Sequence, residues 1–588
     1  MKNAALECVQ SWNADFVENN LKDCLEKLSD YETWQKVSLY SATHSHHYKE
    51  GQLVRIQGMI QDMHNPEYYV SKYTVCNKAT GTKTVRSGKY KDVMRVEPGE
   101  SARCAKDGKD ARERQNLFCI PIPALNKWAL DIHKQNVALP EIHAEFGQSQ
   151  GVKRKEMDED HNDEEMVCED SFKEVKKTEV RIENVAPTSS ASENQSPQNL
   201  DDIKNFSFPV KNVEGQPFYL KVYEYDQSTV MNSMVEVVGF LSADPAISYV
   251  EDDMEESGKK LPASLIPRLH VVCLKNVEHC NPLLPSFNFS SDAALAFANA
   301  QAAVCDLKII FTPLLLGDKL AVDFLICNLL SKVFVRKDVT QLGHLSLNLH
   351  EVPKMTGYVE KFYSILEQLV TKSHYFPLTI EVLNSTPFVP KKDYTCDKLR
   401  SGLLQLSQGT FLVFDETKMT VGQLLDLGTK NVMALKSFLE RQEVEYDFQF
   451  YATPFQTDLS IIIFSERKSL FECDARVPLE SDPEAVKALE ASFEAAVLYL
   501  RNDEVTTRIR RFLTAAQLAN YEIPEIVQTR VQEDFVEMRQ RDKNFTGDDL
   551  HIVLNLARLL TLSTGAQALT AEIWKQACAM EGARRARL

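Results

Sequence analysis

The sequence lacks the cysteine spacing of a zinc ribbon or a thioredoxin-type redox site. Its 13 cysteines are dispersed, and no two of them stand in a C-x-x-C arrangement. Sites of both kinds require closely paired thiols. An odd, scattered set suits a reducing compartment, where most cysteines are small core residues. The sequence therefore predicts no cysteine-based metal site.

The chain also lacks the patterns of a leader or a membrane span. Residues 1–53 contain no basic stretch followed by an apolar run, which is the pattern of a signal peptide. The most apolar region, Leu307–Val335, favours a buried helix because charged residues interrupt it. They are Asp318, Lys319, Asp323 and Lys332. We therefore expect a soluble protein of the cytosol or the nucleus, without a membrane partner.

Basic residues are fewer than acidic residues in this chain. The chain carries 67 Lys and Arg against 84 Asp and Glu, which gives a net charge of −17. Phosphate backbones attract basic surfaces and repel acidic ones. The balance argues against a chain that coats nucleic acid along its whole surface, although a local basic groove is compatible with it.

The length of 588 residues predicts about two to four domains, and 44% hydrophobic residues supply ample cores. The chain divides into five segments by residue pattern. They are a helical segment followed by a small β domain at 1–145, an acidic linker at 146–205, a second β block at 206–289, an alternating α/β region at 290–480 and a helical region at 481–588.

The first β segment is predicted from alternating apolar residues and turn residues. Val54, Ile56 and Gly58 alternate with polar residues, Asn65-Pro66 predicts a turn, and Tyr69–Val75 predicts the next strand. Further strands are expected at Thr82–Tyr90, Asn116–Ile122, Pro217–Asp226, Met234–Pro245 and Arg268–Val277. Short strands at this spacing indicate a small sheet or barrel, and the second block is compatible with completion of the same layer.

The segment between the two β blocks has the composition of a disordered linker. Glu156–Asp170 contains nine acidic residues and no Lys or Arg. Such a stretch buries too little apolar area to offset chain entropy. Before it stands the basic cluster Lys153-Arg154-Lys155, a candidate for nuclear import with Lys176-Lys177 as a second half. Ser196, followed by proline, is a candidate phosphorylation site.

From about residue 290, predicted helices and strands alternate. The predicted helices are Asp318–Val335, Thr356–Val370 and Asn431–Arg441, and the predicted strands are His344–Leu349, Leu378–Leu383, a run at Phe411 and Asp458–Phe464. This rhythm favours a parallel α/β layer. After Pro483 we expect helices, one of them capped by Thr546 with Asp549 three residues later.

The strand at Phe411 ends in Asp415-Glu416, the arrangement by which many ATPases hold magnesium and activate water. Such an ATPase also needs a glycine-rich phosphate loop with a lysine, between an earlier strand and helix. That slot reads HEVPKM, His350–Met355, which contains no glycine and places Glu351 where phosphate would sit. No Gly-Lys pair of the chain precedes Ser or Thr. We therefore expect an ATPase-like fold without nucleotide chemistry, cofactor or catalytic residues.

Several segments carry a more specific resemblance. SGLLQLSQGTFLVFDETKM, Ser401–Met419, resembles the second nucleotide-binding motif of minichromosome maintenance (MCM) helicase subunits, and Thr546–Ala579 is similar to their lid helices. The chain as a whole resembles the MCM complex-binding protein family. The segments that carry this resemblance are Val54–Tyr69, Gly88–Val93, Pro262–Val272, His279–Pro285, Lys392–Leu406 and Glu533–Arg539.

The resemblance implies an MCM-like arrangement. It implies OB-like β structure, then a degenerate AAA+-like domain that retains vestigial carboxylates at Asp415 and Glu416, then a helical lid. It also implies a non-enzymatic nuclear protein that associates with MCM subunits in place of one subunit. The roles that follow are release of the complex from chromatin late in S phase, sister-chromatid cohesion and protection of unassembled subunits.

Two other functions stay open from the residues alone. An active AAA+ ATPase is disfavoured by the missing phosphate loop. A single-stranded nucleic-acid binder could use Tyr68, Tyr69, Tyr73 and Lys72 to stack bases and contact phosphates.

Two further groups of residues suggest chemistry only weakly. His44, His46 and His47 lack ligand partners at metal-binding spacing, and we interpret them as a solvated loop. The possible pair of Cys273 and His270 lacks a third catalytic member, and we assign both residues to packing.

Overall fold

The structure is a computed structural model of the chain. It describes residues 6, 8–41, 48–104, 110–135, 207–211, 213–224, 229–243, 266–285, 289–337, 340–395, 397–541, 543 and 545–588. The statements below concern those residues. The linker prediction, the basic cluster Lys153–Lys155, Ser196 and the three histidines His44, His46 and His47 lie outside them.

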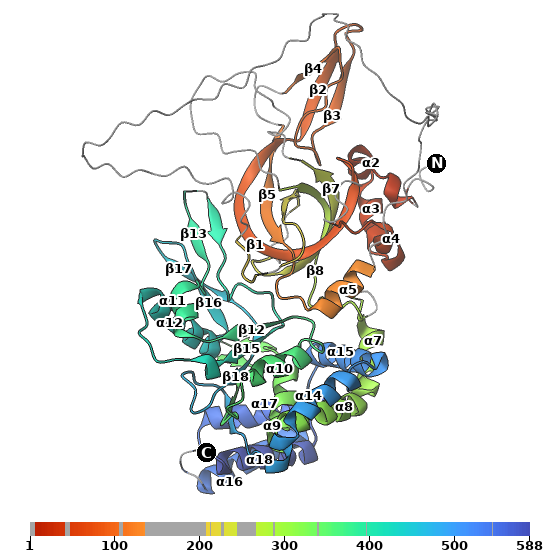
Figure 1. Cartoon of the computed structure of the whole chain (residues 1–588). Coiled ribbons are helices and arrows are strands. Elements are labelled where there is room, and N and C mark those ends of the chain that lie inside the picture. The colour runs from red at the N-terminus through yellow and green to blue at the C-terminus, as the bar shows by residue number, and fades with distance from the viewer. Residues whose placement is uncertain are drawn as a thin grey trace, which may run out of the picture. The chain divides into compact units, whose positions relative to one another are not determined.

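Five strands close into a barrel, which confirms the predicted small β structure (Figure 1). They are β1 (Leu53–Val70), β5 (Ala111–Ile120), β6 (Phe218–Val222), β7 (Met234–Ser242) and β8 (Arg268–Asn276). The order around the barrel is β1-β5-β6-β8-β7, and β7 pairs with β1 to close it. The two strands that precede residue 140 and the three that follow residue 206 therefore share one sheet.

Alternation along the strands fills the inside of the barrel and covers part of its outside. Leu220, Val237 and Leu269 belong to a buried cluster contributed by all five strands. On β7 the intervening residues Val238 and Phe240 pack instead against the N-terminal helical segment. That segment comprises η1 (Val9–Ser11), α2 (Ala14–Asn19), α3 (Leu21–Leu28) and α4 (Tyr31–Lys36).

The turn predicted at Asn65-Pro66 is wrong. β1 runs without interruption from Leu53 to Val70, and its ladder with β5 shifts register between His64 and Glu67. A proline has no N–H for the ladder, and an irregularity of this kind removes the need for one. The predicted second strand begins later, as β2 (Lys72–Asn77), in the three-stranded sheet β3-β2-β4. Its other members are β3 (Lys83–Ser87) and β4 (Glu100–Arg103).

The predicted α/β layer is confirmed as a five-stranded parallel sheet. Its strands are β11 (Leu347–His350), β12 (Ser373–Pro377), β15 (Thr410–Asp415), β18 (Leu459–Phe464) and β19 (Ala475–Pro478). The order is β12-β15-β18-β11-β19, and every neighbouring pair is parallel. Numbered along the chain, these strands stand in the order 2-3-4-1-5.

Both faces of this sheet are buried. On β15, Phe411 and Val413 enter one hydrophobic cluster, whereas Leu412 and Phe414 enter another. Such strands read as continuous apolar runs because neither face meets water. The first cluster includes α8 (Ala300–Leu314), α9 (Lys319–Leu330) and α10 (Tyr358–Leu366). The second includes α11 (Ile380–Ser385) and α12 (Asp426–Arg441).

The strand predicted at Leu378–Leu383 is wrong. The strand of that region is β12, which ends at Pro377, and α11 follows at once. Thr379 caps this helix, because its side chain accepts a hydrogen bond from the N–H of Val382 at 3.1 Å. The β-branched residues favoured a strand, but the cap and the fixed φ of Pro377 start a new element here.

Two hairpins that the sequence did not predict form a separate four-stranded sheet. It has the order β14-β13-β16-β17. The strands are β13 (Lys391–Asp393), β14 (Lys398–Arg400), β16 (Glu443–Asp447) and β17 (Ala452–Gln456). Figure 1 shows β13, β16 and β17 beside α11 and α12. A short pair, β9 (Val335–Lys337) with β10 (Thr340–Leu342), follows α9.

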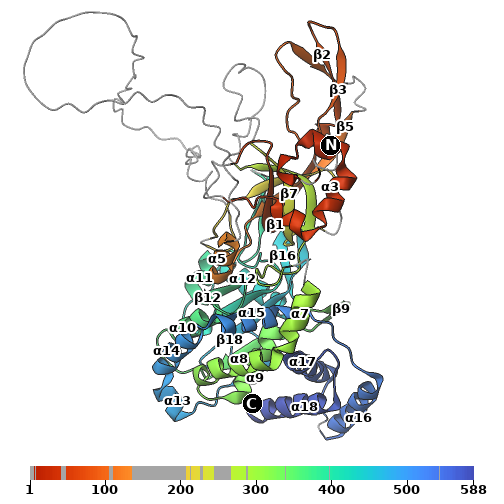
Figure 2. The same cartoon turned by 90° about the vertical axis from the view of Figure 1, so that its right-hand side faces the viewer.

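The helical end of the chain is confirmed. It contains α13 (Pro483–Lys487), α14 (Leu489–Tyr499), α15 (Asp503–Gln517), α16 (Glu525–Arg541), α17 (Gly547–Ser563) and α18 (Ala571–Ala586). Thr546 and Asp549 form the predicted cap as a reciprocal capping box. α17 lies against α18 and α9 (Figure 2). The remaining helices are α5 (Lys127–Gln135) and α7 (Phe289–Ala298).

No single helix of the described ranges is long and apolar enough to cross a bilayer. Ser290–Ala298 and Ala300–Leu314 meet the length and composition requirement only together, across a bend of 61°.

A buried polar seam joins the barrel to the hairpin sheet and to the segments that precede β12 and β15. The Asp62 carboxylate on β1 accepts a hydrogen bond from the N–H of Leu399 at 3.0 Å. The Gln405 amide donates to the carbonyl of Gln61 at 2.9 Å. Leu125 forms an isolated antiparallel bridge with Lys372, at the edge strand β12. Because these groups are buried or nearly so, each loses water on folding and depends on its partner across the seam.

We predict that Asp62→Asn lowers the free energy of unfolding by about 1–3 kcal/mol. Asp62 Oδ1 accepts from the N–H of Met63 and Oδ2 from the N–H of Leu399. An asparagine amide keeps the shape, but its NH₂ must face one of those two donors. Urea denaturation of both proteins measures the change.

Asp397→Asn is the matched control. Asp397 contacts the same Lys392 ammonium as Asp62, at 3.1 Å, but its side chain is 64% exposed. Exposed pairs contribute little, so its substitution should change the unfolding free energy by less than about 0.5 kcal/mol. Equal effects of the two substitutions would contradict the seam's role.

Candidate functional site

The carboxyl edge of the parallel sheet is where the sequence placed a vestigial nucleotide site. Leu349, Phe464 and Asp415 are level with one another in the registers of β11, β18 and β15. Ligands of open α/β sheets bind outside such carboxyl ends. The structure therefore brings the HEVPKM slot and Asp415-Glu416 to one edge, as the spacing predicted, and the end of β18 at Ser465-Glu466 lies at the same edge.

The slot between β11 and α10 is tied to the neighbouring strand. The N–H of Val352 donates to the carbonyl of Ser465 at 3.3 Å, and the N–H of Ser465 donates to Leu349 at 3.1 Å. Pro353 has no N–H to offer. A phosphate cradle needs several free N–H groups that point at one anion. The backbone of this slot supplies hydrogen bonds to protein instead.

Acidic side chains stand where a phosphate would need positive charge. Glu351 adopts a left-handed backbone (φ 64°) directly after β11, and Glu360 lies in the first turn of α10. Two cations at this edge pair with carboxylates. Lys418 pairs with Glu360 at 2.7 Å, and Lys354 pairs with Glu466 at 3.2 Å. Lys354 and Lys418 are therefore committed to carboxylates rather than to a phosphate cradle.

Asp415 is fully buried, and its oxygens are taken by neighbouring residues. Oδ2 accepts from the Tyr375 hydroxyl at 2.7 Å, and Oδ1 accepts from the Thr417 N–H at 3.0 Å and from the Thr417 hydroxyl. Burial, followed by the bond to Asp415, raises the pKa of Tyr375 above its usual range, so this hydroxyl stays a donor. Asp415 caps the short helix η5 (Glu416–Lys418), which is a structural role.

Glu416 points to a different loop. Its Oε1 accepts from the Ser469 hydroxyl at 2.7 Å and from the N–H of Leu470 at 3.3 Å. Burial raises the pKa of Glu416 to about 7 despite these two bonds. The two adjacent carboxylates therefore diverge, Asp415 toward β12 and Glu416 toward the loop after β18. No group of three or more His, Cys, Asp or Glu side chains among the described residues could hold a metal ion.

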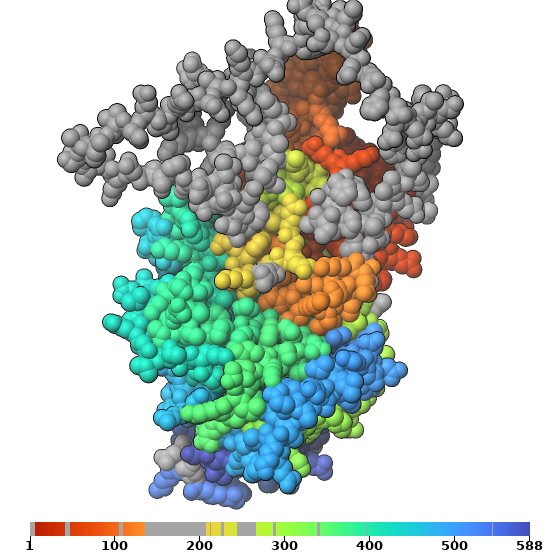
Figure 3. All heavy atoms as spheres, viewed as in Figure 1, coloured from red at the N-terminus to blue at the C-terminus, as the bar shows by residue number. Residues whose placement is uncertain are grey.

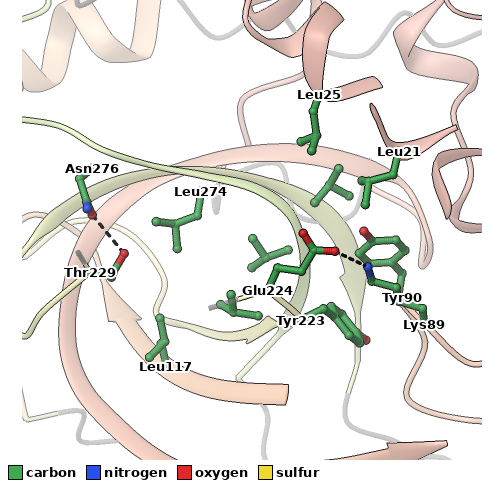
Figure 4. A pocket seen from close by; sticks show the side chains of 13 residues that line it. Leu21, Leu25, Lys89, Tyr90, Leu117, Tyr223, Glu224, Thr229, Leu274 and Asn276 are labelled. Atoms are coloured by element: carbon green, nitrogen blue, oxygen red, sulfur yellow. Dashed lines mark hydrogen bonds and ion pairs between the residues drawn. The ribbon is translucent and has the colours of Figure 1, made fainter. Parts of the chain in front are cut away.

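A pocket lies at the barrel, away from this edge. It has a volume of about 180 Å³ and includes Leu21 and Leu25 of α3 and Tyr223 beside β6. Figure 4 shows Lys89 paired with Glu224 and Thr229 bonded to Asn276 around it. Four of its polar side chains thus pair within the lining, and the Tyr223 hydroxyl bonds outside it, to His270 and Arg114.

A second, smaller pocket of about 40 Å³ contains the buried Lys372. Burial lowers the pKa of Lys372, a shift that catalytic lysines also show. Its ammonium, however, donates to the Ser407 hydroxyl at 2.7 Å and to the Gln408 carbonyl. The space suits a few water molecules rather than a substrate. We interpret Lys372 as part of the seam.

The residues of the nucleic-acid alternative do not form one surface. Tyr68 is 74% exposed, whereas Tyr73 is 1% exposed and its hydroxyl accepts from the N–H of Arg95. Tyr69 packs edge-on against Tyr223 at 4.9 Å. Lys72 is exposed on β2. A stacking platform needs several neighbouring open rings, and only Tyr68 is open here.

Sequence reasoning missed an ionic cluster on the barrel's outer side. Asp92 is 3% exposed and contacts Arg114 at 2.7 Å, Arg268 at 3.4 Å and His270 at 3.2 Å. These neighbours hold the pKa of Asp92 far below its usual range against the opposing effect of burial. His270 also bonds to Tyr223, while Cys273 packs under the N-terminal helices. No pattern of spacing in the sequence links these residues, because they come from separate strands and loops.

Comparison with known proteins gives a consistent result over nearly the whole chain. The family model described as "Mini-chromosome maintenance replisome factor" matches residues 24–588. The "Mini-chromosome maintenance complex-binding protein" of Drosophila melanogaster is 34% identical over 582 residues, covering 97% of this chain and 94% of that protein. The proteins of the same name from Bos taurus and Homo sapiens are each 31% identical, covering 98% of this chain and 94% of theirs.

We predict that Glu416→Gln stabilises the protein more at pH 8 than at pH 5. The folded protein retains the Glu416 proton up to about pH 7, whereas the unfolded chain releases it near 4.5. Between these values the folded state binds more protons, so wild-type stability falls as pH rises, by at most about 3 kcal/mol. Glutamine does not titrate and avoids that loss. Denaturant unfolding at both pH values measures the difference.

Glu466→Gln serves as the control, because the Glu466 side chain is 37% exposed and only pairs with Lys354 at the surface. Because exposed ion pairs contribute little, this substitution should change the free energy of unfolding by less than about 0.5 kcal/mol. A gain for Glu416→Gln that is the same at pH 5 and pH 8 would contradict the assignment of a buried, protonated Glu416.

Proposed function

The chain belongs to the Mini-chromosome maintenance replisome factor family, and from that premise we propose that it binds the MCM complex without catalysing a reaction. The relatives' shared name states the binding. The observation that supports a non-enzymatic role is the carboxyl edge of the parallel sheet. Its slot lacks a phosphate cradle, and its Asp415 caps the short helix η5.

We propose further that the fold is a degenerate version of the helicase subunit's own. In the parallel sheet, β15, which ends at Asp415, lies beside β18, and β18 lies beside β11. An AAA+-like core requires this order of strands. The five-stranded barrel is compatible with an OB-like domain. The helices after Pro483 follow the parallel sheet in the chain, as the lid helices of the proposed plan would. The domain boundaries given above stay predictions.

A pseudo-ATPase of this plan can act by competing for interfaces. It would present to a neighbouring MCM subunit a surface similar to that of another subunit, and so take the place of one. Without a phosphate cradle it cannot help to close an ATP-bridged ring. Competition requires only a difference in affinity and mass action. We therefore propose roles in disassembly of the complex on chromatin, in protection of unassembled subunits and, through replication, in sister-chromatid cohesion.

The expected outcome for the purified protein is nucleotide-independent binding to at least one MCM subunit. Mixing it with individual subunits, then sizing the products and identifying them by mass spectrometry, tests this. The double variant Asp415→Asn, Glu416→Gln should bind equally well, because neither carboxylate faces a nucleotide in the proposal. Calorimetry should detect no ATP binding.

Three results would count against the proposal. Micromolar ATP affinity would favour an active ATPase. Failure to bind any MCM subunit would remove the proposed function. A shift of single-stranded DNA in gels that disappears at high salt, without subunit binding, would favour the nucleic-acid alternative.

We propose a nuclear location, with Lys153-Arg154-Lys155 contributing to import. We predict that replacing these residues together with Lys176 and Lys177 by alanine reduces the nuclear fraction of a fluorescently tagged chain, since import depends on accessible basic clusters. The control replaces Lys391, Lys398 and Arg400, which lie in the folded hairpin sheet. An unchanged nuclear distribution of the first variant would contradict the assignment.

A further inference from the structure

The hairpin sheet presents large aromatic side chains to solvent. Between β16 and β17, Phe450 is 85% exposed and Tyr451 is 60% exposed, and Tyr394 at the end of β13 is 46% exposed. The rings of Tyr394 and Phe450 lie 5.7 Å apart. We call these three residues the aromatic tip. The hairpin sheet belongs to the part of the chain coloured green to cyan in Figure 3.

The backbone of the tip is fixed by hydrogen bonds. The N–H of Gln449 donates to Asp447 at 2.7 Å, and its side-chain amide donates across to the carbonyl of Lys392 at 3.1 Å. The Tyr394 hydroxyl donates to the carbonyl of Phe448 at 3.1 Å. Gln449 adopts a left-handed backbone, with φ of 63°. The two hairpins therefore brace each other and hold the rings outward.

The rings themselves are held in part by stacking. Tyr451 stacks on Phe448 at 5.2 Å with an interplanar angle of 14°. Rigid aromatic anchors lose little conformational entropy when they bind, and such residues dominate the energetics of protein interfaces. Exposure of a rigid apolar cluster to water is unfavourable in free energy, and burial in a partner's apolar pocket would remove this cost.

The charged residues around the tip are largely paired with one another. Arg400 contacts Asp393 at 2.6 Å, and Lys391 contacts Asp447 at 3.6 Å. Lys392 contacts Asp397 at 3.1 Å. Their charges need no external counter-charge, so the surface does not favour a polyanion. An apolar centre with a polar, charge-balanced rim is the anatomy of a protein–protein contact.

We propose that the aromatic tip inserts into an apolar pocket on an MCM subunit. This inference rests on the proposed function and names the surface that carries it. The partner's pocket would be lined by aliphatic or aromatic side chains and rimmed by polar groups. The contact needs no nucleotide, because the tip belongs to the hairpin sheet and not to the carboxyl edge of the parallel sheet.

The test compares two double variants of the full chain. Phe450→Ala with Tyr451→Ala removes the two most exposed rings of the tip and leaves the bracing Tyr394 hydroxyl in place. Val421→Ala with Ile526→Ala removes comparable exposed apolar area elsewhere, since these residues are 107% and 86% exposed. Affinity for each purified MCM subunit is measured by biolayer interferometry, and the melting temperature of each variant is measured in parallel.

We expect the tip variant to bind at least one subunit tenfold or more weakly than wild type, with an unchanged melting temperature, and the control variant to bind as wild type does. Equal affinity of the tip variant and wild type for every subunit that wild type binds would overturn the proposal.

Two other outcomes would also overturn the proposal. If both variants weaken binding equally, the effect is general loss of apolar surface. If wild type sediments as a dimer that the tip variant dissolves, while subunit binding is unchanged, the occupant is a second copy of this chain. Absence of any wild-type binding to MCM subunits would overturn the proposed function itself, which separates that failure from the failure of the tip.

Discussion

Burial of the parallel sheet on both faces is the constraint on which the rest of this structure depends. With helices on each side, the polar groups at the strand ends have little access to water and must find partners within the protein. An ATPase leaves some of these groups for magnesium and phosphate. Here Tyr375 and Thr417 donate hydrogen bonds to Asp415, and Ser469 donates one to Glu416. The carboxyl edge can therefore fold fully without a nucleotide.

Under the proposed function, these internal hydrogen bonds have a consequence for binding. The interface proposed for this chain would not change with bound nucleotide, so its occupancy would depend on concentration and on competing partners. The seam at Asp62 and Lys372 adds rigidity. The Asp62 carboxylate bonds to the N–H of Leu399, and the Lys372 ammonium contacts the sulfur of Met234 on β7, so separation of the barrel would uncover these buried groups.

The sequence was most informative where one physical signal dominated. The apolar runs of β15 and β18, the alternation in β7 and the capping pair Thr546 and Asp549 each predicted their element correctly. It was misleading where a local signal was overridden. Pro66 predicts a turn, but β1 continues past it with a shift of register. The β-branched residues near Thr379 predict a strand, but Thr379 caps a helix instead. The ionic cluster around Asp92 could not be predicted, because its members meet only in the folded barrel.

The aromatic tip shows why exposure must come from the structure. Phe448–Tyr451 lies between β16 and β17 and contains three aromatic residues. The ordinary expectation for such residues is burial. Phe448 fulfils part of that expectation by stacking under Tyr451, whereas Phe450 does not. The difference arises because Gln449 turns the chain in a left-handed conformation and bonds to the opposite hairpin. Hydrogen bonds thus fix the position of the apolar rings. Because the rings stay exposed to water, the free energy of burying them is available to a partner that covers them.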